Sequence, residues 1–115
     1  MQSDRTSETM KRYEGNREEG VVTVTVNGLL LNPRHDLRNH SPNGFEWGYG
    51  GSGPAQLALA ILADYFGKDE PALAVYQSFK WAVVANLPKH AWSITNRQID
   101  QALKEIRTQD AGGAA

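Results

Sequence analysis

Alternating apolar and polar residues form the clearest strand pattern in the chain. Valine occupies positions 22, 24 and 26 with threonine between them, and the pair Asn27-Gly28 separates this run from three leucines. Asn-Gly is the favoured pair for a two-residue hairpin turn, because both central positions need positive φ. The pattern predicts an antiparallel β-hairpin over residues 21–31, with Val26 opposite Leu29. A lone hairpin is marginal in water, so other elements have to cover its apolar face.

Three later stretches predict helices. Residues 54–66 are almost wholly apolar, which is typical of a buried helix, and Pro54 suits its first turn. Residues 70–86 carry apolar side chains at helical spacing. Residues 96–108 follow Thr95, which forms a capping box with Gln98. A hairpin followed by three helices predicts an α+β fold, with a small sheet packed on the helices.

The remaining segments give weaker patterns. Two short stretches, residues 11–15 and 45–47, are expected to add strands to the sheet. Residues 88–92 indicate a loop that places Trp92 near the surface. We expect one domain over residues 11–108, a disordered tail over residues 1–10 and a flexible tail over residues 109–115.

Composition narrows the classes of function. The 115-residue chain has no cysteine, which excludes a disulfide scaffold, a thiolate metal site and a cysteine nucleophile. Its 12 basic and 13 acidic residues nearly cancel, so non-specific nucleic-acid binding is not favoured. The longest strongly apolar run has seven residues, and the polar N-terminus resembles no signal peptide. We therefore expect no membrane association and a cytoplasmic protein.

The most unusual segment is Gly48-Tyr49-Gly50-Gly51-Ser52-Gly53, directly before the first predicted helix. Three interpretations are open. The glycines could form a tight connection that lets a buried helix start close to the sheet. They could instead present backbone N–H groups to an anion at the helix N-terminus, or form a contact surface with the neighbouring aromatic residues. The spacing matches a dinucleotide-binding fingerprint, but a second helix stands where that fold needs a parallel strand.

Other candidate chemistry is sparse. Arg34 and Arg38 form the one local basic cluster, beside two histidines. The spacing of His35 and His40 matches no strong zinc pattern, so no metal site is expected. No spacing supports a set of catalytic residues, and none is assigned. No cofactor is expected either.

Residues 40–62, HSPNGFEWGYGGSGPAQLALAIL, resemble the signature of a small family of unknown function found in bacteria, plasmids and phages. The later segments YQSFK, residues 76–80, and VANLP, residues 84–88, are similar to the same family. The resemblance covers about residues 11–108 and implies no activity, cofactor or catalytic residue. It does imply occurrence on mobile elements, whose small proteins often bind a host or defence component, as inhibitors of CRISPR systems do.

These observations favour a small interaction protein, more in keeping with a non-enzymatic role, that binds a host protein or ribonucleoprotein and acts as an anti-defence inhibitor. The predicted contact surface combines the glycine segment and its aromatic neighbours with the two arginines, and consists of Arg34, Arg38, Trp47, Tyr49, Gly50, Gly51, Ser52 and Gly53. The alternative is an enzymatic or ligand-binding domain that holds a phosphate-bearing molecule at residues 48–53. A nucleic-acid-binding module is the third hypothesis.

Overall fold

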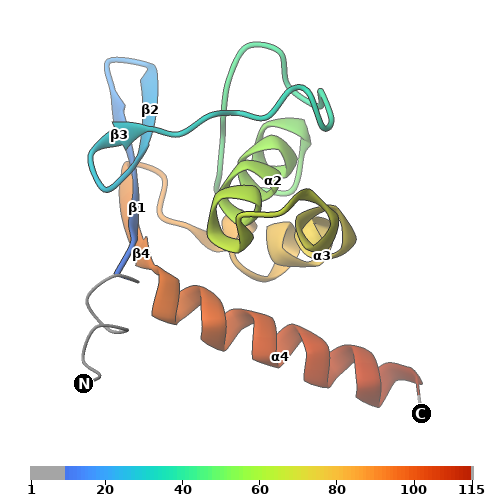
Figure 1. Cartoon of the computed structure of the whole chain (residues 1–115). Coiled ribbons are helices and arrows are strands. Elements are labelled where there is room, and N and C mark those ends of the chain that lie inside the picture. The colour runs from blue at the N-terminus through green and yellow to red at the C-terminus, as the bar shows by residue number, and fades with distance from the viewer. Residues whose placement is uncertain (1–9, 115) are drawn as a thin grey trace, which may run out of the picture.

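A four-stranded antiparallel sheet forms one layer of the protein (Figure 1). The computed structural model describes residues 10–114, and the side chains of residues 10–109. The strands are β1 (Arg12–Glu18), β2 (Val21–Val26), β3 (Leu29–Leu30) and β4 (Ala91–Thr95). Their order in the sheet is β3-β2-β1-β4, so β3 and β4 are the two edges.

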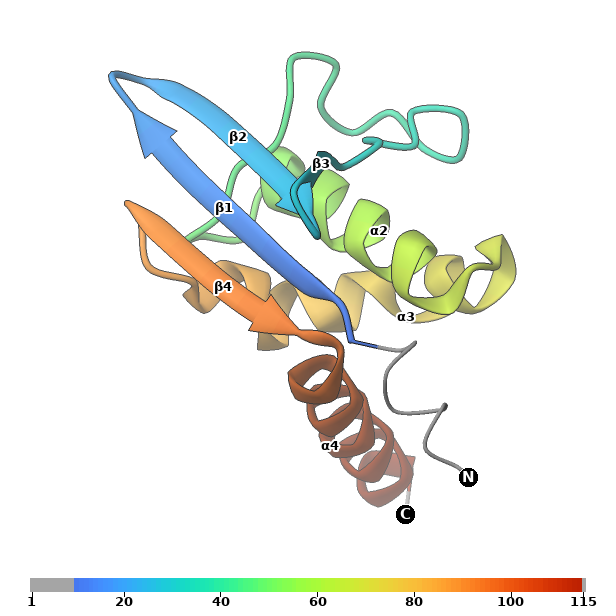
Figure 2. The same cartoon turned by 60° about the vertical axis from the view of Figure 1, so that its left-hand side comes forward.

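Helices cover one face of this sheet. They are α2 (Ser52–Phe66), α3 (Asp69–Ala82), the 3-10 turn η1 (Val84–Asn86) and α4 (Asn96–Ala114). Helix α2 lies against the sheet, α3 packs on α2, and α4 leaves the end of β4 and runs past α3 (Figure 2). Residues 53–63 of α2 are all buried, as expected of a helix that is apolar on every side. Within residues 10–114, no helix is long and apolar enough to cross a membrane.

The α+β fold and the hairpin are confirmed. Asn27 and Gly28 have φ of 49° and 85°, the left-handed values that the turn requires. Val26 lies opposite Leu29, as the two-residue turn dictates. The side chain of Val24 then faces α2 and is buried.

The strand predicted near residues 11–15 is real, but it is longer and lies in the interior of the sheet. β1 pairs with β2 on one side and with β4 on the other. Tyr13 points to the helical side, where its hydroxyl donates a hydrogen bond of 2.6 Å to Asp64 of α2. Gly15, two residues on, leaves room for the ring of Trp92.

Two predictions, a strand over residues 45–47 and a loop over residues 88–92, are wrong. Residues 45–47 form no strand and pair with none of the four strands. Trp47 is instead held by its side chain, which is fully buried and whose indole N–H donates to the carbonyl of Lys89 over 2.9 Å. The fourth strand is β4, which begins within the loop predicted over residues 88–92 and continues to Thr95. Trp92 is consequently buried rather than near the surface, and its ring meets that of Trp47 edge-on at 5.5 Å.

The helix boundaries differ from the prediction in two places. α3 ends at Ala82 and gives way to η1, so the predicted helix over residues 70–86 is divided. The capping box of α4 is confirmed, since Thr95 N–H donates to the Gln98 side chain over 2.8 Å and Gln98 N–H donates back over 3.3 Å. α4 continues to Ala114, so the segment expected to be a tail from residue 109 begins inside a helix. Of the tail expected over residues 1–10, residues 1–9 lie outside the described residues.

Candidate functional site

The glycine loop, residues 48–53, carries two aromatic rings directly on its backbone. A methyl group at Gly50 would lie 2.2 Å from the ring of Trp81, which comes from the end of α3. A methyl group at Gly51 would lie 2.5 Å from the ring of Tyr49. Real contacts are never this short, so only glycine lets the rings rest where they do. The loop therefore acts as a flat support for two aromatic side chains.

Both rings are open to solvent, and each has a lysine beside it. Trp81 is 60% exposed and Tyr49 is 47% exposed. The ammonium group of Lys80 lies 4.4 Å from the centre of the Trp81 ring, and that of Lys89 lies 5.8 Å from the centre of the Tyr49 ring. Among the described side chains, neither lysine forms an ion pair. We call Tyr49, Lys80, Trp81 and Lys89 the aromatic patch; Lys80 is only 8% exposed, so Lys89 is its solvent-exposed cation.

The carboxylate that borders this patch is already neutralised. Glu46 packs its side chain against Gly53, and Arg17 donates two hydrogen bonds to its carboxylate, over 2.8 and 2.9 Å. These bonds hold the pKa of Glu46 below its ordinary value. The guanidinium group of Arg17 in turn lies 4.8 Å above the ring of Trp47. The charge of Lys89 also contributes to the lowered pKa of Glu46, so these two groups attract each other without forming an ion pair.

The structure divides the predicted contact surface. Trp47 has no exposed surface, so it supports the loop from inside and cannot touch a partner. Arg34 is bound to Asp36 and to Asp69, the first residue of α3, over 3.0 and 3.1 Å. Trp81 stands 12 residues further along that helix, roughly 18 Å away at 1.5 Å per residue.

Each of the other predicted residues lies either near Arg34 or in the glycine loop. Arg38 is exposed on the same long connection as Arg34, where its guanidinium group donates to the carbonyl of Leu37. Tyr49 remains on the surface with the exposed Ser52. Gly50, Gly51 and Gly53 serve the packing described above.

Residues 13–105 match the model of a family of unknown function, DUF6166. The chain belongs to the DUF6166 family. The resemblance to a family of unknown function, expected over residues 11–108, is thereby confirmed. The particular signature and the occurrence on mobile elements stay predictions. No curated protein and no solved structure matches the chain.

Of the four patch residues only Tyr49 belongs to the contact surface predicted from the sequence, and the exposed ring of Trp81 is the most important residue that the prediction omits. The sequence places Trp81 in the predicted helix over residues 70–86, whose apolar side chains recur at helical spacing. The observed α3 buries Ala72, Tyr76, Phe79 and Lys80, at spacings of four, three and one. Position 81 lies a further 100° around the helix, and this turn carries Trp81 away from the core. The helical spacing of the buried residues is therefore the one sequence pattern that would have placed Trp81 outside the core.

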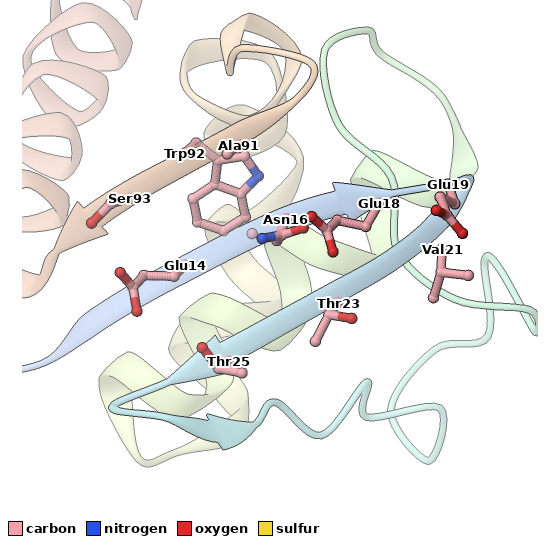
Figure 3. A pocket seen from close by; sticks show the side chains of 11 residues that line it. Glu14, Asn16, Glu18, Glu19, Val21, Thr23, Thr25, Ala91, Trp92 and Ser93 are labelled. Atoms are coloured by element: carbon pink, nitrogen blue, oxygen red, sulfur yellow. The ribbon is translucent and has the colours of Figure 1, made fainter.

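The outer face of the sheet in this DUF6166 fold is a broad polar hollow (Figure 3). Its side chains come from alternate positions of three strands and include Glu14, Glu18, Thr23, Thr25 and Ser93. Alternation of this kind is the ordinary consequence of a sheet with one face on the core and one in water. The hollow therefore needs no ligand to explain it.

The Arg17–Glu46 pair makes stability depend on acidity in a testable way. A carboxyl group whose pKa is lowered by folding stabilises the native state above its unfolded pKa, and the effect is lost as pH falls through the folded value. We expect Glu46→Gln to be less stable than the wild type at pH 7 and to lose less stability between pH 5 and pH 3. Urea unfolding at a series of pH values measures the difference. Parallel pH profiles for the two proteins would contradict a stabilising pair.

Proposed function

We propose that this DUF6166 protein is an interaction protein that binds a host protein or ribonucleoprotein through the aromatic patch. The observation that carries the proposal is the exposure of Trp81 and Tyr49, whose rings pack closely on Gly50 and Gly51. Tryptophan and tyrosine are enriched among the residues that dominate binding energy at interfaces. Rings already held in place lose little further conformational freedom on binding, which favours affinity.

The charge of the patch adds a statement about the partner. Lys89 is exposed and lies at the face of the Tyr49 ring with no ion-pair partner among the described side chains, whereas Lys80, at the face of the Trp81 ring, is buried. A partner surface that carries a carboxylate would pair with Lys89 while an apolar side chain covers the rings. We therefore propose an acidic protein surface as the counterpart. The sequence analysis expects a host defence complex as the target, so the proteins of such complexes are the first candidate partners to look for.

Capture of the partner from a host lysate tests the proposal. The tagged wild-type chain, Tyr49→Ala and Trp81→Ala serve as baits, with Val21→Ala as the matched control. Val21 is 65% exposed but belongs to the outer face of the sheet. We expect one protein to be retained by the wild type and by Val21→Ala and to be lost with both ring variants. A partner retained equally by all four baits would refute the patch, and nuclease-sensitive capture would favour the nucleic-acid hypothesis.

The lysine contribution is separable from that of the rings. We expect Lys89→Glu to weaken binding of the captured partner about fivefold, an effect that added salt should diminish. Lys104→Glu, an exposed position on α4, is the control with the same change of charge. Equal affinities of the two variants would show that the partner does not read the charge of the patch.

A further inference from the structure

A second surface of the molecule lies at the open edge of the sheet. β3 is the last strand in the order, and only β2 pairs with it. Leu31 donates its N–H to the carbonyl of Val24, so the backbone groups of Leu30, one residue earlier, point away from β2. An edge with free N–H and C=O groups is a template for another strand.

The side chains at this edge are apolar and exposed. Leu30 is 77% exposed and Leu29 is 73% exposed, the highest values among the large apolar residues described. Met10 joins them at the same corner, because the side-chain amide of Asn27 donates to its carbonyl. Natural edge strands are often protected by charged side chains, by proline or by being very short. β3 has neither a charge nor a proline, and its two residues leave Leu30 as the position where another strand can pair.

The charges around the edge identify a suitable occupant. The groove beside β3 is lined by two cations and two carboxylates, and each is in an ion pair: Lys11 with Asp64 over 3.0 Å, and Arg34 with Asp69 over 3.1 Å. A two-fold contact places a surface against its own copy, so any unbalanced charge repels itself. The lining of this groove satisfies the condition, since Asp36, the second partner of Arg34, lies outside it. The aromatic patch does not, because its exposed Lys89 forms no ion pair among the described side chains.

We propose that β3 pairs with β3 of a second copy, antiparallel across a two-fold axis. The two four-stranded sheets then join into one sheet of eight strands. Leu30 of each copy stands opposite Leu30 of the other and exchanges both of its free backbone hydrogen bonds with it. The two Leu30 side chains, each on the outer face beside Thr25, lie next to one another across the axis.

Charge substitution at Leu30 tests this register directly. The apparent mass of the wild-type chain in sedimentation should rise towards twice its 12.7 kDa as the concentration is raised to about 1 mM. At that concentration even a Kd near 100 μM gives mostly dimer. Leu30→Lys and Leu30→Glu should each sediment as monomers, since like charges then meet on the axis. An equimolar mixture of the two variants should recover dimer, because the opposed charges attract.

The controls separate pairing at β3 from other association. Val21→Lys introduces the same charge at an exposed valine at the far end of β2, and Trp81→Ala alters the aromatic patch. Both should remain dimeric, and thermal unfolding confirms that every variant is folded. A monomeric wild type at all concentrations would overturn the proposal. So would a dimer that persists in Leu30→Lys, or a mixture that stays monomeric.

Discussion

Replacing Gln56 by methionine should lower the free energy of unfolding by about 3 kcal/mol, since four hydrogen bonds to backbone groups are lost together. Gln56 is fully buried in α2. Its amide oxygen accepts the N–H groups of His40 and Ser41, over 2.7 and 3.1 Å. Its amide nitrogen donates to the carbonyls of Pro33 and Arg38, over 2.6 and 3.0 Å. One side chain thus fastens the long connection between β3 and α2, and methionine has the same length without the polar atoms.

The same substitution at Gln77, an exposed residue of α3, is the matched control and should change stability by less than about 0.5 kcal/mol. Chemical denaturation measures both variants. Hydrogen exchange should also show faster opening at His40 and Ser41 in Gln56→Met, because their N–H groups lose their acceptor. A Gln56→Met protein as stable as Gln77→Met would show that the connection does not depend on this amide.

Gly15→Ala should cost about 2–3 kcal/mol, a large effect for one added methyl group. The new carbon atom would lie 2.3 Å from the indole of Trp92, which covers Gly15 from the neighbouring strand. The indole cannot simply turn away, because the fully buried Trp47 packs against it edge-on. Either the ring or the strand has to move, and thermal or urea unfolding reports the cost.

A double-mutant cycle assigns that cost to the ring. In a Trp92→Leu background the smaller side chain leaves space, so Gly15→Ala should cost less than about 1 kcal/mol. Glu14→Ala, on the exposed face of the same strand, controls for the alanine itself. If Gly15→Ala costs the same in both backgrounds, the clash with Trp92 is not its cause.

The parts of the fold that the sequence predicts are those with local causes. Asn27-Gly28 imposes its turn through the φ values of two neighbouring residues. The capping box at Thr95 and Gln98 depends on residues three apart. The burial of α2 follows from its being apolar on every side. In each case the residues that decide the structure are close together in the chain.

The parts that were missed or only partly predicted depend on partners distant in the chain. The sequence predicts only the first part of β1, over residues 11–15, because Gly15 and Arg17 face the helices and interrupt the apolar alternation. Trp92 and Glu46 complete these positions in the folded protein. β4 has only five residues, and its alternation is weak because Ala91 is apolar but exposed.

Contacts between residues distant in the chain also determine the surroundings of two tryptophans. The contact between Gly50 and the ring of Trp81 joins residues 31 positions apart, and it holds that ring at the surface. Trp47 is covered instead by the distant Trp92. No local pattern encodes either contact.

The affinity of the captured partner for the wild-type chain and for Trp81→Ala is the measurement that bears most directly on the aromatic patch. Isothermal titration calorimetry should give binding to Trp81→Ala that is weaker by at least about 2 kcal/mol, roughly thirtyfold. The melting temperature should stay close to that of the wild type, because most of this side chain is exposed. Val21→Ala should bind like the wild type. Equal affinities of the wild type and Trp81→Ala would contradict recognition through this surface.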